Sequence, residues 1–322
     1  MPVFGDIPVT DIALDDGAFV VTYRPQMQRL LDSVARMGVL TPLHLRRPAE
    51  SAPLQLVAGS KRLRAARQAG QATVPALLHE AGELSEQQAF LLAVHDNLAC
   101  RPFNAVEKAR ILRRLRYDFQ YPDAALTEQF CPLLDLPPRT GTLEAYCTLA
   151  MLDDALQAVT VESALPVDVA VWVGGLDAAD RQAVLPLFAG LQLGSNRAQE
   201  CAAYIDEVCR RDACSAAALF ERLGIPALLA EPQRSGPQKR EAVRHALRQA
   251  RYPQLTAHEQ RYREAVRRLR LPPAIALRPP PYFENRQYQV SFSFGRRQEL
   301  RHAAQRLLDA AESDAMDDLF NL

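Results

Sequence analysis

Two hydrophobic patterns alternate along residues 1–80. The runs Leu43–Leu45 and Leu54–Val57 are short and mostly apolar, as is typical of buried strands. The segments Met27–Met37 and Lys61–Gln71 instead repeat apolar residues every three or four positions, which predicts amphipathic helices. This mixture indicates a small α/β domain at the start of the chain.

A helical period dominates residues 85–214 and predicts an all-helical middle domain. Within it, helices expected at Glu128–Leu134 and Gly141–Met151 are joined by the short segment DLPPRT, the arrangement of a helix-turn-helix. The second helix offers few side chains that could read bases, and Glu144 would repel phosphate. A structural helix pair without sequence readout therefore stays an alternative. The candidates for DNA contact in this unit are Arg139, Thr140 and Thr142.

The C-terminal part begins with Glu231–Lys239, which is rich in Pro, Gly and Ser and is interpreted as a linker. Basic helices follow. Apolar and polar side chains then alternate over Tyr288–Phe294, which predicts a half-buried strand. The next helix places Leu300, Ala304 and Leu307 on one face. A strand-helix unit of this size is too small to be stable alone, so we expect it to pair with a second copy.

Composition changes this picture mainly through the distribution of charge. The 322 residues, 48% of them hydrophobic, suffice for two or three domains. The net charge is zero, but residues 1–235 carry 22 Lys and Arg against 28 Asp and Glu, whereas residues 236–322 carry 16 against 10. If the protein binds nucleic acid non-specifically, the C-terminal part is therefore the better candidate for the contact. Because no long apolar run and no basic, apolar leader occurs, we expect a cytoplasmic protein without membrane contact.

The clearest chemical signal is the segment VAGSKRLRAARQAGQATVP, residues 57–75. Gly59 lies between a predicted strand and a predicted helix, where free backbone N–H groups and the positive end of the helix dipole favour an anion. Lys61 and Arg62 add formal charge at the same place. The turn lacks the glycines of a Walker loop or a GxGxxG motif. It predicts a phosphate site, with a merely solvated basic helix as the alternative.

A second basic surface is expected on the helix Asn104–Phe119. Its cations surround the helix and do not form a single stripe, so only some of them could reach a DNA backbone or a nucleotide phosphate. Asn104 followed by Glu107 fits a capping box, which explains these two residues structurally. Arg110 and Arg113 are the candidates on this helix for contact with DNA.

Three segments together resemble the ParB-type partition proteins in order, spacing and residue type. They are LLDSVARMGVLTPLHLRR, GSKRLRAARQAGQATVP and DNLACRPFNAVEKA, which begin at residues 30, 59 and 96. The resemblance implies an α+β chain: a small ParB/sulfiredoxin-like nucleotide-binding domain at residues 1–100, a helical domain with a helix-turn-helix at 101–230, a linker and basic helix at 231–255, and a C-terminal dimerisation domain at 256–322. Sulfiredoxin carries a catalytic cysteine in the motif that corresponds to the segment after Gly59. That cysteine is absent here, since Ser60 and Lys61 occupy these positions.

ParB-type proteins bind CTP with magnesium, close as a clamp around DNA and hydrolyse the CTP slowly. The resemblance therefore implies a homodimeric, nucleoid-associated protein that acts in plasmid or chromosome segregation or in locus regulation. Asp96 takes the place of the glutamate linked to hydrolysis, and Asn97 would hold Mg²⁺, which prefers such oxygen ligands. The implied nucleotide-binding residues are Thr41, Gly59, Ser60, Lys61, Arg62 and Asn97.

The sequence departs from the family pattern at three positions. Ser60 replaces the usual glutamate, Lys61 replaces an arginine and so loses its planar fork, and Cys100 replaces another arginine, with Arg101 one place later. The chain is expected to be at most a slow CTP hydrolase. A phosphotransferase or nuclease on the same domain and a degenerate adaptor stay alternatives. A ParA-type ATPase is a further candidate partner, although residues 1–23 contain no Lys or Arg of the kind that stimulates such a partner.

Overall fold

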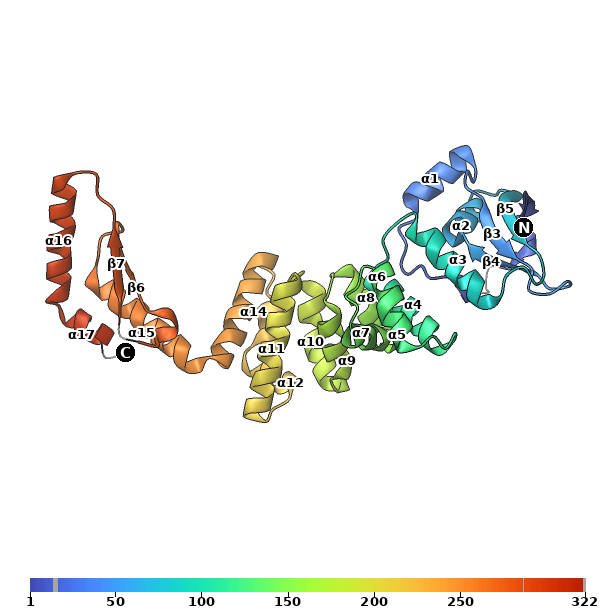
Figure 1. Ribbon diagram of the computed structural model, residues 1–322. Helices are drawn as coiled ribbons and strands as arrows, with labels where there is room; N and C mark the ends of the chain where they lie inside the picture. Colours follow the sequence, from blue (N-terminus) through green and yellow to red (C-terminus); the bar gives the residue numbers. More distant parts are fainter. Residues whose placement is uncertain (14–16, 286, 321–322) are drawn as a thin grey trace. The chain divides into compact units, whose positions relative to one another are not determined.

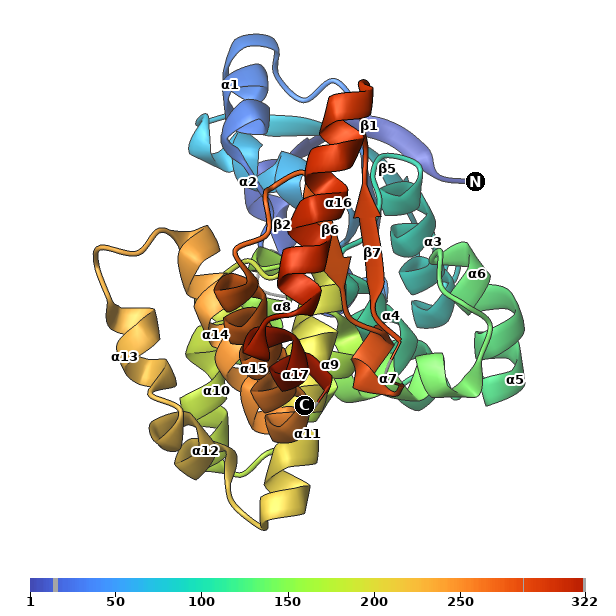
Figure 2. The same ribbon diagram turned by 90° about the vertical axis from the view of Figure 1, so that its left-hand side faces the viewer.

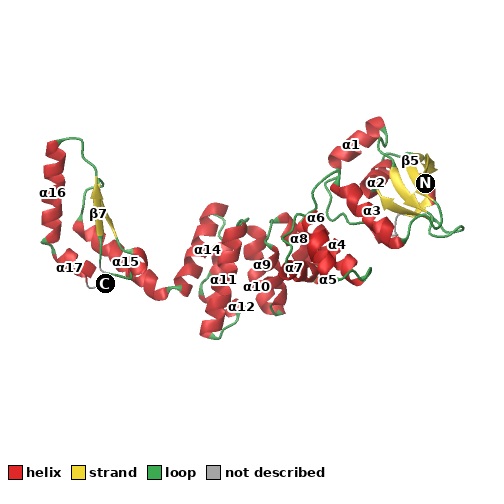
Figure 3. Cartoon of the chain, in the orientation of Figure 1, coloured by secondary structure: helices red, strands yellow, loops and turns green. Residues whose placement is uncertain are grey.

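The structure is a computed structural model that describes residues 1–13, 17–285 and 287–320 (Figure 1). The chain is α+β and divides into two compact units, Met1–Gln199 and Glu200–Leu322. Strands occur in the first part of the chain and again near its end, with helices between them (Figure 3). The four predicted segments of the chain are finer than this division, and their three boundaries stay predictions.

The first unit opens with a five-stranded mixed sheet in the order β1-β5-β3-β4-β2. Parallel pairs join β3 to β5 and β2 to β4, and antiparallel pairs join β1 to β5 and β3 to β4. Leu56 and Val57 are neighbours on β4 but belong to different buried clusters, because successive side chains of a strand point to opposite faces. The elements are β1 (Val3–Pro8), η1 (Val9–Asp11), β2 (Ile12–Ala13), η2 (Gly17–Phe19), α1 (Gln28–Met37), β3 (Leu43–Arg46), β4 (Leu54–Ala58), α2 (Ser60–Gln68), β5 (Thr73–His79) and α3 (Glu86–Leu98).

Helices cover both faces of this sheet. Leu63 of α2 and Val34 of α1 are buried with Leu43 and Leu56 on one side. On the other side, Phe90 of α3 packs with Val57 and with the core of the following helices. The predicted helices and the strands at 43 and 54 are confirmed, whereas β1, β2 and β5 were not predicted.

The rest of the first unit is helical. Asn104 caps α4 and Glu107 completes the capping box, as predicted. The predicted first helix of the helix-turn-helix begins earlier than expected, at Asp123, and runs as three consecutive segments to Leu133. The second begins at Thr140, after a turn in which Asp135 has φ +54°. The elements are α4 (Ala105–Tyr117), α5 (Asp123–Ala125), η3 (Leu126–Phe130), α6 (Cys131–Leu133), α7 (Thr140–Met151), α8 (Asp154–Glu162), α9 (Val167–Gly175) and α10 (Ala178–Gly190), followed by α11 (Ser195–Asp212) where the two units meet in the sequence.

The second unit contains helices and one two-stranded antiparallel sheet, in which β6 and β7 lie side by side (Figure 2). The elements are α12 (Ala216–Arg222), α13 (Ile225–Ala230), α14 (Gly236–Arg251), α15 (Pro253–Leu269), β6 (Ile275–Arg278), η4 (Pro281–Phe283), β7 (Gln289–Phe292), α16 (Arg297–Ala311) and α17 (Asp314–Phe320). No helix in the described ranges is both long and apolar enough to span a membrane.

The predicted linker Glu231–Lys239 is wrong in its second half, which forms the first turn of α14. Ser235 is the N-cap, Pro237 occupies the first turn, and Gln238 bonds back to the Ser235 N–H at 2.8 Å. Pro and Ser are common at helix starts because the first N–H groups have no partner within the helix. The composition that resembled a linker is therefore partly helix-capping chemistry.

The C-terminal strand is shorter than predicted and is not half-buried in one chain. Only Gln289–Phe292 are in β7, Val290 is 44% exposed, and Phe294, beyond the strand, is 54% exposed. The following helix α16 buries Ala310 but leaves Leu300 and Leu308 exposed by 37% and 58%. Of the alternating apolar side chains, Tyr288 and Phe292 are thus partly buried, whereas the single chain leaves Val290 and Phe294 uncovered.

Candidate functional site

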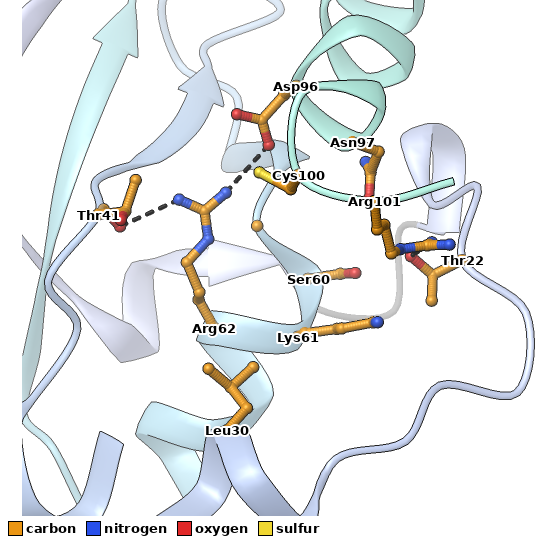
Figure 4. A pocket seen from close by; sticks show the side chains of 11 residues that line it. Thr22, Leu30, Thr41, Ser60, Lys61, Arg62, Asp96, Asn97, Cys100 and Arg101 are labelled. Carbon is orange, nitrogen blue, oxygen red and sulfur yellow. Dashed lines mark hydrogen bonds and ion pairs between the residues drawn. The ribbon is translucent and has the colours of Figure 1, made fainter. Parts of the chain in front are cut away.

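The seven residues predicted for nucleotide chemistry line one pocket of the first unit, with a volume of about 260 Å³ (Figure 4). They come from the turn before β3, from the start of α2 and from the end of α3. Four further lining residues were not predicted as part of the site. Arg101 was noted only as a displaced arginine, and nothing in the sequence marked the wall formed by Thr22. The lining residues are Thr22, Leu30, Thr41, Gly59, Ser60, Lys61, Arg62, Asp96, Asn97, Cys100 and Arg101.

Gly59 makes the sharp turn from β4 into α2. Its φ is +104°, which side chains other than glycine rarely adopt, and a Cβ there would lie 3.0 Å from Cγ of the fully buried Leu43. Ser60, Lys61 and Arg62 are the first residues of α2, so their N–H groups have no carbonyl partner earlier in the helix. The pocket therefore contains a helix N-terminus, which favours an anion.

Arg62 connects the three walls of the pocket. Its guanidinium donates to the carbonyl oxygens of Thr41 at 3.1 Å and Pro42 at 2.7 Å, and to Oδ2 of Asp96 at 3.0 Å (Figure 4). Both ends of the ion pair are mostly buried, with side chains 17% and 22% exposed. Its positive charge is thus balanced within the site by Asp96.

Lys61 differs from Arg62 because it forms no ion pair with any carboxylate in the described part of the chain. Burial lowers the pKa of its ammonium group, and the nearby Arg101 lowers it further, against an opposing effect of Glu107. A negatively charged ligand would relieve this repulsion between neighbouring cations. Lys61 is therefore the pocket cation best placed to gain from an added phosphate.

Asp96 and Asn97 supply oxygen atoms of the kind that Mg²⁺ prefers. The Asn97 side-chain amide donates to the Ala93 carbonyl at 2.8 Å, so its nitrogen is engaged and its Oδ1 can serve as a ligand. The two residues fit a magnesium ion that also takes oxygen atoms from a bound phosphate. In the described ranges no group of three or more His, Cys, Asp or Glu forms a metal site without such help.

A buried carboxylate lies behind the pocket. Glu107 of α4 is 1% exposed and forms a bidentate ion pair with Arg101, at 2.6 and 2.8 Å. The same carboxylate accepts the backbone N–H groups of Tyr23 at 2.8 Å and Asn104 at 2.9 Å. The pocket wall and the start of α4 are therefore attached to each other through one side chain.

Two histidines of the sheet are stacked with ring centroids 5.9 Å apart, His44 on β3 and His79 on β5. The buried His44 Nδ1 and His79 Nε2 have no hydrogen-bond partner among the described residues. Burial lowers both pKa values. For His44 the nearby Asp96 opposes the effect and Arg62 adds to it, and for His79 the neighbouring His44 adds to it.

We expect acid to destabilise the first unit through these histidines. Because their pKa values are lowered in the folded state, the unfolded chain binds more protons below about pH 6.5, so stability is complete above that pH and falls as the pH decreases. Thermal unfolding at pH 7.5 and 5.5 should show a smaller loss in melting temperature for His44→Gln/His79→Gln than for the parent. His245→Gln, at an exposed position of α14, serves as the control and should behave like the parent. Equal losses in all three proteins would exclude the histidine pair as the cause.

The residues predicted to contact DNA fall into two groups. Arg139 and Thr140 are exposed and Thr142 is partly buried at the start of α7. Arg113 of α4 lies at the other end of α7, where its Nε donates to Met151 Sδ at 3.1 Å. Since the two ends of α7 are about 16 Å apart, the structure does not gather these candidates into one patch.

Most of the α4 arginines are engaged within the protein. Arg110 donates to Gln157 Oε1 at 2.8 Å and lies 4.3 Å from the centre of the Tyr23 ring. Arg114 and Arg116 form ion pairs with acidic neighbours. The DNA contact predicted for Arg110 would have to replace existing bonds, whereas Arg139 forms no ion pair in the part of the chain that the structure describes.

Fold and pocket together define an α+β domain followed by helices, with a pocket lined by the three cations Lys61, Arg62 and Arg101. Residues 15–98 match the family model described as the ParB N-terminal domain. This segment is therefore a ParB N-terminal domain, as the resemblance predicted.

Curated relatives agree with this assignment. A probable plasmid-partitioning protein ParB of Thermus thermophilus is 40% identical over 82 residues, 26% of this chain and 26% of the relative. A probable chromosome-partitioning protein ParB of Pseudomonas putida is 28% identical over 135 residues, 39% of this chain and 45% of the relative. The matched segments thus span less than half the length of these relatives.

Similar solved structures include the truncated ParB of Caulobacter crescentus, described as complexed with CTP-gamma-S. It is 23% identical, covers 58% of this chain and 98% of its own, and has a TM-score of 0.27. The same protein complexed to the centromeric parS site is 20% identical, covers 56% and 91%, and has a TM-score of 0.35.

Proposed function

We propose that this chain is a ParB-like, CTP-gated DNA-binding protein that forms a clamp on DNA and acts in chromosome or plasmid segregation or in locus regulation. The observation that carries the proposal is the pocket of the ParB N-terminal domain, where the start of α2, Lys61 and Arg62 converge. The relatives are named for partition, and two structures of a similar protein are described with a CTP analogue and with parS DNA. No observation favours the phosphotransferase, nuclease or adaptor alternatives over this function.

Nucleotide binding would use both chemical features of the pocket. The N–H groups at the start of α2 and the cations at 61 and 62 would hold the phosphates, and Thr41 would line the cavity. Asn97 would hold Mg²⁺ together with phosphate oxygens. Asp96 is the candidate for assisting slow hydrolysis, but its carboxylate is paired with Arg62, so we expect turnover to be weak.

DNA binding would use the helix-turn-helix and a second copy of the chain. The proposed base or backbone contacts are the exposed Arg139 and Thr140 and the partly buried Thr142 at the start of α7, with Arg113 as a separate contact to phosphate. The apolar side chains left exposed on β7 and α16 support a homodimer through the C-terminal unit. Such a protein would work at the nucleoid, and a ParA-type ATPase stays a proposed further partner.

Calorimetric titration with CTP, ATP, GTP and UTP in magnesium buffer tests the nucleotide half of this proposal. We expect CTP to bind selectively and Lys61→Ala to weaken it at least about tenfold, because a phosphate loses a pocket cation that, unlike Arg62 and Arg101, forms no ion pair among the described residues. Lys108→Ala, which changes a lysine outside the pocket, is the matched control and should bind CTP like the parent. A parent protein that binds none of the four nucleotides would refute the proposed switch.

A further inference from the structure

The carboxylate of Glu107 makes more contacts than helix capping requires. A capping box needs one bond from the Glu107 side chain, to the Asn104 N–H, and this bond is present at 2.9 Å. The carboxylate also accepts the Tyr23 N–H and both terminal nitrogens of Arg101. A buried carboxylate with four donors is a fixed point of the structure, because moving it would leave several buried groups without partners.

Arg101 occupies the exposed end of this network. Its side chain is 25% exposed and lines the pocket, whereas Glu107 is 1% exposed and lies behind it. The ion pair is therefore oriented with its positive end toward the cavity. The opposing effects on the neighbouring Lys61 agree with this orientation, since its pKa is lowered more by Arg101 than it is raised by Glu107.

The guanidinium of Arg101 retains donors for a ligand. Its short bonds go to Glu107, while those to Thr22 Oγ1 at 3.3 Å and the Pro102 carbonyl at 3.2 Å are longer. The Nε–H has no acceptor among the described residues, and the two longer bonds can be exchanged for charged oxygens at little cost. An anion in the pocket can thus bind Arg101 without breaking its contact with Glu107.

The same carboxylate also fixes a second wall. Tyr23 donates its N–H to Glu107 and accepts a bond from the Asn104 side chain at 3.3 Å, and the preceding Thr22 lines the pocket. One buried group therefore sets the positions of Arg101 and of the backbone that carries Thr22.

We propose that Glu107 is a positioning residue of the pocket, which holds the Arg101 guanidinium in place to bind a phosphate of the ligand. Arg101 is then a third cationic phosphate contact beside Lys61 and Arg62. This inference rests on the proposed nucleotide function and extends it to two residues outside the glycine turn.

A double-mutant cycle in the full chain tests the inference, with CTP and inorganic tripolyphosphate as titrants. We expect Arg101→Met and Glu107→Gln each to weaken binding about tenfold, and the double variant to bind no more weakly than Arg101→Met alone, because Glu107 acts through Arg101. Glu128→Gln removes an exposed acid elsewhere and should leave both affinities unchanged. A Glu107→Gln effect that is equally large in the Arg101→Met background would show a merely structural role and overturn the proposal.

Arg101→Lys provides a second test that does not require Glu107→Gln to fold. Lysine keeps the charge but cannot form the bidentate contact with Glu107. The affinity of this variant for CTP and tripolyphosphate should therefore fall close to that of Arg101→Met. Parent-like binding by Arg101→Lys would mean that charge alone matters and would overturn the positioning role. If the parent binds tripolyphosphate but not CTP, the proposed nucleotide specificity fails, and the tripolyphosphate affinities of the variants decide the Arg101–Glu107 inference. If the parent binds neither titrant, both proposals fail.

Discussion

Arg62→Ala should lose CTP affinity by at least about 30-fold, which corresponds to about 2 kcal/mol. The substitution removes a proposed phosphate contact and also the three bonds by which Arg62 holds the Thr41–Pro42 turn and Asp96. Asp96 would then face an incoming phosphate as an unpaired negative charge, which adds repulsion to the lost attraction. Calorimetric titration with CTP in magnesium buffer measures the effect.

Two control variants separate the causes. Arg64→Ala removes an exposed arginine of the same helix, outside the pocket, and should bind CTP like the parent. Arg62→Lys keeps the charge without the planar fork and should fall between parent and alanine variant. In DNA-retention measurements CTP should alter the parent's loading but not that of Arg62→Ala. An alanine variant that loads DNA as well as the parent, with CTP equally effective, would contradict the proposed gating.

Gly59→Val should both destabilise the first unit and close the pocket. A β-branched residue at φ +104° is strained by about 1–3 kcal/mol. Its Cβ would also lie 3.0 Å from Leu43 Cγ, in a core that cannot yield freely, which adds about 1–3 kcal/mol. Thermal unfolding should show a melting temperature lower by roughly 5–15 °C, and CTP binding should be lost because the start of α2 is displaced.

Gly70→Val is the matched control for this prediction. Gly70 also has a positive φ, +69°, but a Cβ there would have no neighbour within 4 Å. Its variant should show the backbone strain without the clash, and should keep CTP binding because Gly70 does not line the pocket. Equal stability and binding in the two variants would mean that contact with Leu43 does not matter.

Much of the pocket could be predicted because its chemistry is local in sequence. The glycine turn, the cations at 61 and 62 and the acid-amide pair at 96 and 97 each stand in a short, recognisable segment. Arg101 was harder to place, because its direction depends on a carboxylate six positions later that the capping box already explained. Thr22 could not be predicted at all, since its place in the pocket depends on the bond that the neighbouring Tyr23 N–H donates to Glu107 of a distant helix and not on a local pattern.

The errors in the predicted fold also come from contacts and covering that a short stretch of sequence does not show. The strand β5 (Thr73–His79) begins in the last three residues of the segment that was assigned to the phosphate turn. Its partners β1 and β3 are distant in sequence, so no local pattern indicates the pairing. The Ser-Gly-Pro composition around Ser235 fits a linker and a helix cap equally well, and only the Gln238 bond distinguishes them. For β7 the alternating pattern correctly predicted a strand. The burial of its side chains depends instead on which other elements pack against the strand, and Val290 is left exposed.

The contact between Arg62 and the Thr41–Pro42 turn has a genetic consequence. Both acceptors in that turn are peptide carbonyl oxygens, which every amino acid supplies. Codon changes at 41 or 42 that preserve the backbone path would therefore leave the anchoring intact, whereas a change at 62 removes it in one step. Of the residues that form this contact, only Arg62, on the helix opposite to the turn, has to keep its side chain.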